Sequence, residues 1–156
     1  SRLRGSAVSA ASSEQPASSG AWGVVFALFA VGNLANGLWM LASPGHWYIH
    51  LPANVPGSGP LNEHFVRDIG CVFSLIGVVL AIAVWKPRFR LTALLFATGF
   101  YGAHALVHVY DSVRGLFPAG QWRYDLLPVY GTTLLLFVLS LWIARSGRGR
   151  RSARSI

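Results

Sequence analysis

Four long apolar runs constrain what this chain can fold into. They cover residues 22–42, 69–85, 91–110 and 126–144. Each run holds roughly 17–21 residues, which as a helix at ~1.5 Å per residue crosses or nearly crosses a ~30 Å hydrocarbon core. Only 12% of the 156 residues are charged, whereas a soluble domain usually carries about 25%. The sequence therefore predicts an integral membrane protein with four spans.

The connections between the runs predict how the spans are arranged. "WKPRFR" is a tight turn between the second and third runs, and "PGHWYIHLPANVPGSGPLNEHF" is a longer loop rich in Pro and Gly. Short connections make neighbouring helices antiparallel. Asn62 is placed to cap the second helix, which then begins outside its apolar run and covers about residues 64–85. We expect an all-α, up-down bundle of four transmembrane helices.

The bundle is expected to form one domain, residues 21–145, between two tails. Residues 1–20 are rich in Ser and Ala, which predicts a flexible segment, and residues 146–156 are strongly basic. The first run lacks a clear A-x-A cleavage site and is longer than the apolar region of a signal peptide. We therefore expect it to be retained as a span.

The net charge of +8 is distributed unevenly along the chain. Basic residues gather before the first run, in the 86–90 turn and after the fourth run, leaving only Arg67, Arg114 and Arg123 in the other connections. The positive-inside rule places the basic side in the cytoplasm. Both termini and the 86–90 turn are thus predicted to face in, and the longer loops to face out. This pattern fits contact with a lipid bilayer, and we expect no nucleic acid partner.

Polar side chains recur in the outer third of the predicted bundle, at matching depths on neighbouring helices. They are Tyr101, His104, His108 and Asp111 on the third helix, His64, Arg67 and Asp68 on the second, and Asn36 on the first. Helical spacing puts the members on each helix on one face. A charged side chain at the membrane centre costs at least ~2.5–3.5 kcal/mol and usually faces the bundle interior or a cavity. The sequence predicts an outward-facing polar pocket.

One interpretation of the pocket is a metal centre. His104 and His108, four residues apart, can bind one ion from a single helix face, and Asp111 could ligate it or orient a ring. His64 and Asp68 repeat the spacing on the next helix. Histidine and carboxylate ligands suit zinc or copper. Haem b is less favoured, because only His64 offers an opposite axial ligand and it lies near the surface.

Two further interpretations stay open. The pocket could bind a quinone, an isoprenoid or another lipid, with or without catalysis, and Tyr101, Arg67 and Asn36 would then contact the ligand. Alternatively, the polar groups could only hold the helices in register, as interhelical hydrogen bonds do in many membrane proteins. The corresponding functions are an accessory protein or subunit with a ligand site, a membrane enzyme, and a purely structural subunit.

The stretch "NEHFVRDIGCVFSLIGVVLAI" resembles the DoxX-like group of four-helix bacterial membrane proteins and its uncharacterised relatives. The matching positions are Phe65, Arg67, Asp68 and Gly70, and "LANGLWMLASPGHWY" is similar to the end of their first helix. The resemblance implies a bundle in the bacterial cytoplasmic membrane and a role near the quinone pool or as a small subunit beside a partner. The histidines of "HALVHVYD" depart from that pattern, so the sulfur-oxidation activity of DoxX proteins is not carried over.

Overall fold

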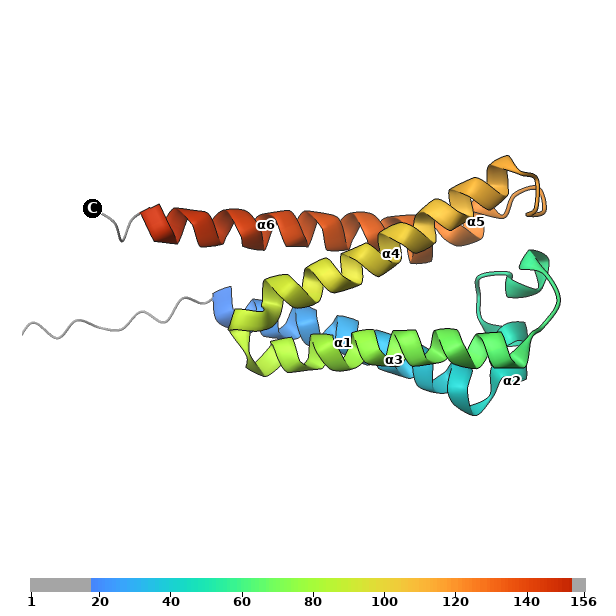
Figure 1. Cartoon of the computed structure of the whole chain (residues 1–156), viewed down its shortest axis with the longest axis horizontal. Coiled ribbons are helices and arrows are strands. Elements are labelled where there is room, and N and C mark those ends of the chain that lie inside the picture. Colours follow the sequence, from blue (N-terminus) through green and yellow to red (C-terminus); the bar gives the residue numbers. More distant parts are fainter. Residues whose placement is uncertain (1–17, 153–156) are drawn as a thin grey trace, which may run out of the picture.

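The computed structural model describes residues 18–152, with side chains described for residues 20–146. Its four long helices are α1 (Ser18–Ala42), α3 (Glu63–Trp85), α4 (Arg90–Val113) and α6 (Thr132–Ser152) (Figure 1). The connecting segments are α2 (Pro44–His50), the 3₁₀ turns η1 (Val55–Ser58) and η2 (Pro87–Phe89), α5 (Trp122–Asp125) and the π-helical turn η3 (Leu126–Gly131). Within the described residues there is no strand.

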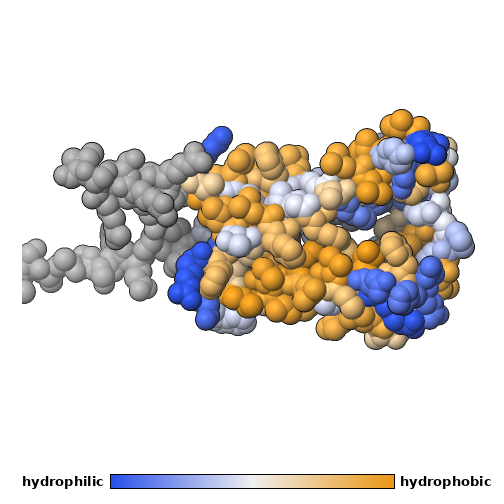
Figure 2. Space-filling model, in the orientation of Figure 1, coloured by the Kyte–Doolittle hydropathy of each residue, from blue (hydrophilic) through white to orange (hydrophobic). Residues whose placement is uncertain are grey.

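Four helical segments are long and apolar enough to cross a membrane. They are Gly20–Ala42, Glu63–Trp85, Pro87–Val113 and Trp122–Ser146. Apolar residues cover the middle of the molecule and hydrophilic residues gather towards its two ends (Figure 2). The prediction of an all-α, four-span fold is thereby confirmed, and the chain is a small integral membrane protein. Its orientation across the membrane stays a prediction.

The helix ends differ slightly from the predicted spans, for local reasons. Asn62 caps α3 as predicted: its side-chain oxygen accepts a hydrogen bond from the backbone N–H of Phe65 at 3.1 Å. The fourth span begins earlier than residue 126, because α5 and η3 lead into α6 as further helical turns. The predicted flexible tail falls mainly outside the described residues. The basic segment after residue 145 is helical as far as Ser152.

Glycines let α1 and α3 pack closely against each other. A Cβ atom added to Gly37 would lie 2.5 Å from the Oγ of Ser74 and 2.7 Å from the backbone oxygen of Gly70. At Gly77 the added atom would lie 2.6 Å from the Cγ of Leu34. Such small residues allow two helix backbones to approach in a membrane, where dispersion contacts drive association. The α1–α3 pair is therefore the tightest helix contact of the fold.

The main apolar core lies in the half of the molecule that contains η2, which we call the basic end. All four long helices contribute to it, through the buried residues Phe26, Ala30, Ile76, Leu80, Ala83, Ala93, Leu94, Ala97, Leu136 and Leu139. Arg90 closes this end: its guanidinium donates to the backbone oxygen of Ala83 at 3.2 Å and lies 5.7 Å from the ring centre of Phe26. The charge thereby caps the end of α3.

The opposite half, which contains α2, η1 and α5, is the loop end. Here α4 diverges from α3 (Figure 1). The buried apolar cluster is small, formed by Met40, Trp47 and Val66 within α1, α2 and α3. The α4–α6 pair contributes no member to that cluster. At the loop end, other contacts must therefore join the α4–α6 pair to the α1–α3 pair.

The glycine contact can be tested with a matched pair of substitutions in α1. Gly37→Ala forces the backbones of α1 and α3 apart, and we expect it to lower the free energy of unfolding by about 1–3 kcal/mol. Gly32→Ala is the control, because a Cβ atom there has nothing within 4 Å, and it should be neutral or slightly stabilising. Unfolding by titration with sodium dodecyl sulfate in mixed micelles measures both. Equal effects would contradict the close approach.

Candidate functional site

A buried carboxylate and a histidine form the centre of the loop end. The Oδ2 of Asp125, at the end of α5, lies 2.9 Å from the Nδ1 of His108 on α4. The side chain of Asp125 is only 2% exposed and that of His108 16% exposed. A charged or polar group this deeply buried is stable only when it is paired and hydrogen-bonded. The His108–Asp125 pair thus joins α4 to the start of the fourth span.

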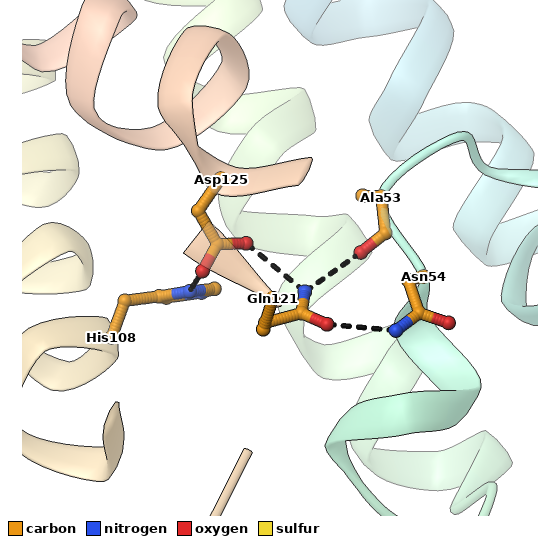
Figure 3. A network of polar contacts seen from close by, with 5 residues as sticks. All are labelled: Ala53, Asn54, His108, Gln121 and Asp125. Carbon is orange, nitrogen blue, oxygen red and sulfur yellow. Dashed lines mark hydrogen bonds and ion pairs between the residues drawn. The ribbon is translucent and has the colours of Figure 1, made fainter. Parts of the chain in front are cut away.

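Gln121 extends this pair to the loop between α2 and η1 (Figure 3). Its Nε2 donates to the Oδ1 of Asp125 at 3.1 Å and to the backbone oxygen of Ala53 at 3.1 Å. Its Oε1 accepts a hydrogen bond from the Nδ2 of Asn54 at 2.8 Å. Gln121 is 3% exposed, so these bonds replace water that the buried amide would otherwise need. The network ties the 51–54 loop to α4 and α5.

The network fixes the chemistry that His108 can perform. A carboxylate only accepts hydrogen bonds, so the Nδ1 that faces Asp125 carries the hydrogen. In the neutral ring, the Nε2 of His108 then keeps its lone pair and is free to accept a proton or a hydrogen bond, or to ligate a metal. This histidine is therefore prepared for acid–base or ligand-binding work.

His104 lies beside this pair. Its ring centre is 4.5 Å from that of His108, at an interplanar angle of 69°, and it stacks parallel to Phe100 at 6.1 Å. The ring centre of Phe117 lies 5.2 Å from that of His108. His104 is half-buried, and its ring has no hydrogen-bond partner among the described residues. The structure thus brings the two predicted histidines together in partly aromatic surroundings.

Two residues predicted to contact a ligand form hydrogen bonds between helices. The hydroxyl of Tyr101 donates to the Oδ1 of Asn33 at 3.0 Å, which links α4 to α1. The Oδ1 of Asn36 accepts a hydrogen bond from the Nε1 of Trp47 at 2.9 Å, which links α1 to α2. Both bonds are the interhelical kind that the structural interpretation expects.

The remaining predicted site residues lie apart from the His104–His108 pair or pair locally. His64 and Asp68 approach each other at 3.5 Å, with side chains 88% and 61% exposed. Arg67 binds Glu63 at 2.9 Å on the same helix. Asp111 is half-buried near the end of α4. In the part of the chain that the structure describes, no three His, Cys, Asp or Glu side chains are arranged to hold a metal ion.

The sequence did not single out Asp125, Gln121 or Asn54 as site residues. Asp125 directly precedes the apolar run that begins at Leu126, which by position alone places it in a connecting loop. The available signal is its spacing from Gln121: Gln121, the residue before α5, and Asp125 are four residues apart, so a helical turn puts both on one face. Asn54 adopts a left-handed backbone with φ of 51°, a conformation that asparagine tolerates better than most residues.

A π-helical turn follows the site directly, beside two open apolar grooves. Pro128 supplies no backbone N–H, so regular α-helical bonding is interrupted and the chain widens within η3. One groove, of about 410 Å³, is lined by Leu51, Pro52, Ala53, Leu127, Pro128 and Thr132. The other, of about 320 Å³, lies between α4 and the η3–α6 segment, beside Gly102 and Tyr130. The first groove shares Ala53 with the polar network.

Comparison with known proteins gives no match: no family model fits the chain, and no curated protein or solved structure is significantly similar to it. The resemblance to the DoxX-like group therefore stays a prediction from the short motif around Arg67 and Asp68.

The role of Gln121 can be tested by removing its amide. Gln121→Ala removes the bonds of Gln121 to the Oδ1 of Asp125, the backbone oxygen of Ala53 and the Nδ2 of Asn54, while His108 stays on the Oδ2 of Asp125. Leaving a buried polar group without its partner costs about 1–3 kcal/mol. We expect faster amide hydrogen exchange in residues 51–58, measured by mass spectrometry in nanodiscs. Ser140→Ala is the control, since it removes a buried hydroxyl bonded to Thr98 in the other half of the fold. Unchanged exchange in residues 51–58 of Gln121→Ala would show that the network does not hold the loop.

Proposed function

We propose that this small membrane protein binds a lipid-soluble small molecule through a hydrogen bond between the ligand's hydroxyl group and the Nε2 of His108. The observation that carries the proposal is the buried contact of 2.9 Å between His108 Nδ1 and Asp125 Oδ2. It leaves Nε2 as an acceptor, and the apolar surroundings strengthen a hydrogen bond made there. Phe117 and His104 supply flat contacts beside the ring of His108, as the walls of small-molecule sites usually do.

A metal ion is the second candidate ligand, favoured by the contact of the His104 and His108 rings at 4.5 Å. A carboxylate on the Nδ1 of a histidine is also the usual support of a metal ligand. Two histidines would hold copper or zinc only together with ligands from outside the described residues, because no third side chain joins them there. Haem b has less support, since the ring of His64 is 88% exposed.

Catalysis on a quinone or another lipid is the alternative from a different class. The His108–Asp125 pair could accept a proton from a bound hydroxyl, as histidine–carboxylate pairs do in acid–base catalysis. A structural subunit of a larger complex is the third possibility, in which the same network serves only to join helices. The proposal includes two further parts. The positive-inside rule favours a cytoplasmic basic end, and the DoxX-like motif favours a location in a bacterial cytoplasmic membrane.

The proposal is tested by what stays bound to the purified protein. The full chain, extracted in mild detergent without chelator, would be analysed by native mass spectrometry, lipid extraction and elemental analysis. We expect a lipid-soluble molecule at about one per chain, retained about tenfold less in His108→Gln and Asp125→Asn, because each loses a charge-assisted hydrogen bond. His64→Gln is the matched control on an exposed histidine and should retain the molecule.

Three other outcomes would each contradict the proposal in a recognisable way. One equivalent of copper or zinc, lost in His104→Gln and His108→Gln, would make the site a metal centre. A folded protein that carries neither metal nor lipid-soluble molecule would leave the network with a structural role. Equal retention in His108→Gln and the wild type would place the ligand elsewhere, with the two apolar grooves as the next positions to examine.

A further inference from the structure

The outward face of α3 differs from the lipid-facing surface of the other long helices. Six of its exposed residues form one stripe along the helix: His64, Asp68, Cys71, Leu75, Val78 and Ile82. Spacings of four and three residues keep such a stripe on one side of a helix. The exposed faces of α1 and α6 have similar spacing within their spans, but they consist of apolar residues such as Val24, Leu28, Leu134 and Val138.

The polar members of the stripe lie inside the span. The span Glu63–Trp85 has 23 residues, which corresponds to ~34 Å of helix against a ~30 Å hydrocarbon core. Asp68 and Cys71 are then ~7 and ~12 Å from the start of the helix. The carboxylate of Asp68 is 61% exposed, and its partner is a histidine that is itself 88% exposed. A carboxylate facing lipid at this depth is costly, so such groups usually contact protein.

The charges on this face are complementary to themselves. Successive helical residues are about 100° apart, so Arg67 and Asp68 lie on opposite flanks of the stripe at nearly the same depth. Two copies of the chain inserted with the same orientation have parallel α3 helices. A twofold axis parallel to the helices then puts Asp68 of the first copy opposite Arg67 of the second, and Arg67 of the first opposite Asp68 of the second. Such reciprocal contacts are what an isologous interface requires. Arg67 is 47% exposed and binds Glu63 at 2.9 Å within its own helix. An exposed ion pair of this kind stabilises little, so Arg67 can exchange it for Asp68 of the second copy.

We propose that the outward face of α3 is the interface of a parallel homodimer. His64, Cys71, Leu75, Val78 and Ile82 form its seam, and reciprocal Arg67–Asp68 ion pairs close its loop end. The small side chain of Cys71 allows the helices to approach near the loop end, as small residues do at transmembrane helix contacts. Since Cys71 is the single cysteine of the chain, the two thiols of the dimer would face each other across the axis.

Oxidative cross-linking in native membranes tests the proposal on the unmodified chain. Treatment with copper–phenanthroline oxidises the two Cys71 thiols to one disulfide, with the electrons taken up by oxygen through the copper complex. A disulfide forms readily only where the Cα atoms come within about 4.4–6.8 Å. We expect a band at twice the 16.9 kDa of the monomer, which a reductant converts back to the monomer.

The control moves the thiol to a similar depth on another exposed face. Cys71→Ser/Leu106→Cys places it on α4, where Leu106 is 71% exposed, and this variant should stay monomeric. Cross-linking as strong as that of the wild type would mean random collision and would overturn the interface. A wild-type chain that stays monomeric, or that cross-links to a different protein, would overturn it as well.

Charge exchange tests the ion pairs separately. Asp68→Arg replaces two ion pairs by two like-charge contacts, so we expect the dimer association constant to fall about tenfold. Arg67→Asp/Asp68→Arg should restore cross-linking through Cys71, because the exchanged charges are again opposite. All these positions are exposed, and a monodisperse elution profile would confirm that each variant folds. A double variant as weak as Asp68→Arg would contradict the reciprocal pairing.

Discussion

The loop end of this protein depends on the burial of one carboxylate. Asp125 lies at the start of the fourth span with almost no exposure, and it is stable there because His108 and Gln121 both donate to it. Each donor connects Asp125 to another segment: His108 belongs to α4, and Gln121 is hydrogen-bonded to the 51–54 loop. A buried charge without partners is far more costly than a broken surface contact. We therefore expect α4, α5 and the 51–54 loop to keep or lose this arrangement together.

The two ends of the molecule are held by different physical means. At the basic end, apolar side chains from all four long helices pack into one core, and Arg90 caps α3. At the loop end the apolar cluster is small, and hydrogen bonds of Gln121 with Ala53 and Asn54 join the helix pairs through the 51–54 loop. A membrane protein gains little from apolar burial between helices, because lipid is equally apolar. Polar pairing therefore carries more of the specificity at the end where the histidines lie.

The sequence predicts the fold almost completely, because four uncharged runs of bilayer length leave one class of architecture. It also predicts the Asn62 cap and the convergence of His104 and His108, since both follow from spacing within one helix. The partners of those histidines do not follow from spacing. Asp111 is on the same helical stripe, yet Asp125 from another helix meets His108, and only the path of the 114–121 loop decides this. The pairing of Arg67 with Glu63, by contrast, follows from a spacing of four residues within α3.

The most direct measurement of the central claim is the tautomer of His108. Solid-state ¹⁵N NMR of histidine-labelled protein in lipid bilayers distinguishes a protonated from an unprotonated ring nitrogen, and His108→Gln assigns the signal among the five histidines. The contact with Asp125 requires hydrogen on Nδ1 and, in the neutral ring, a free Nε2. In Asp125→Asn this preference should weaken. A neutral His108 with hydrogen on Nε2 in the wild type would contradict the site described here.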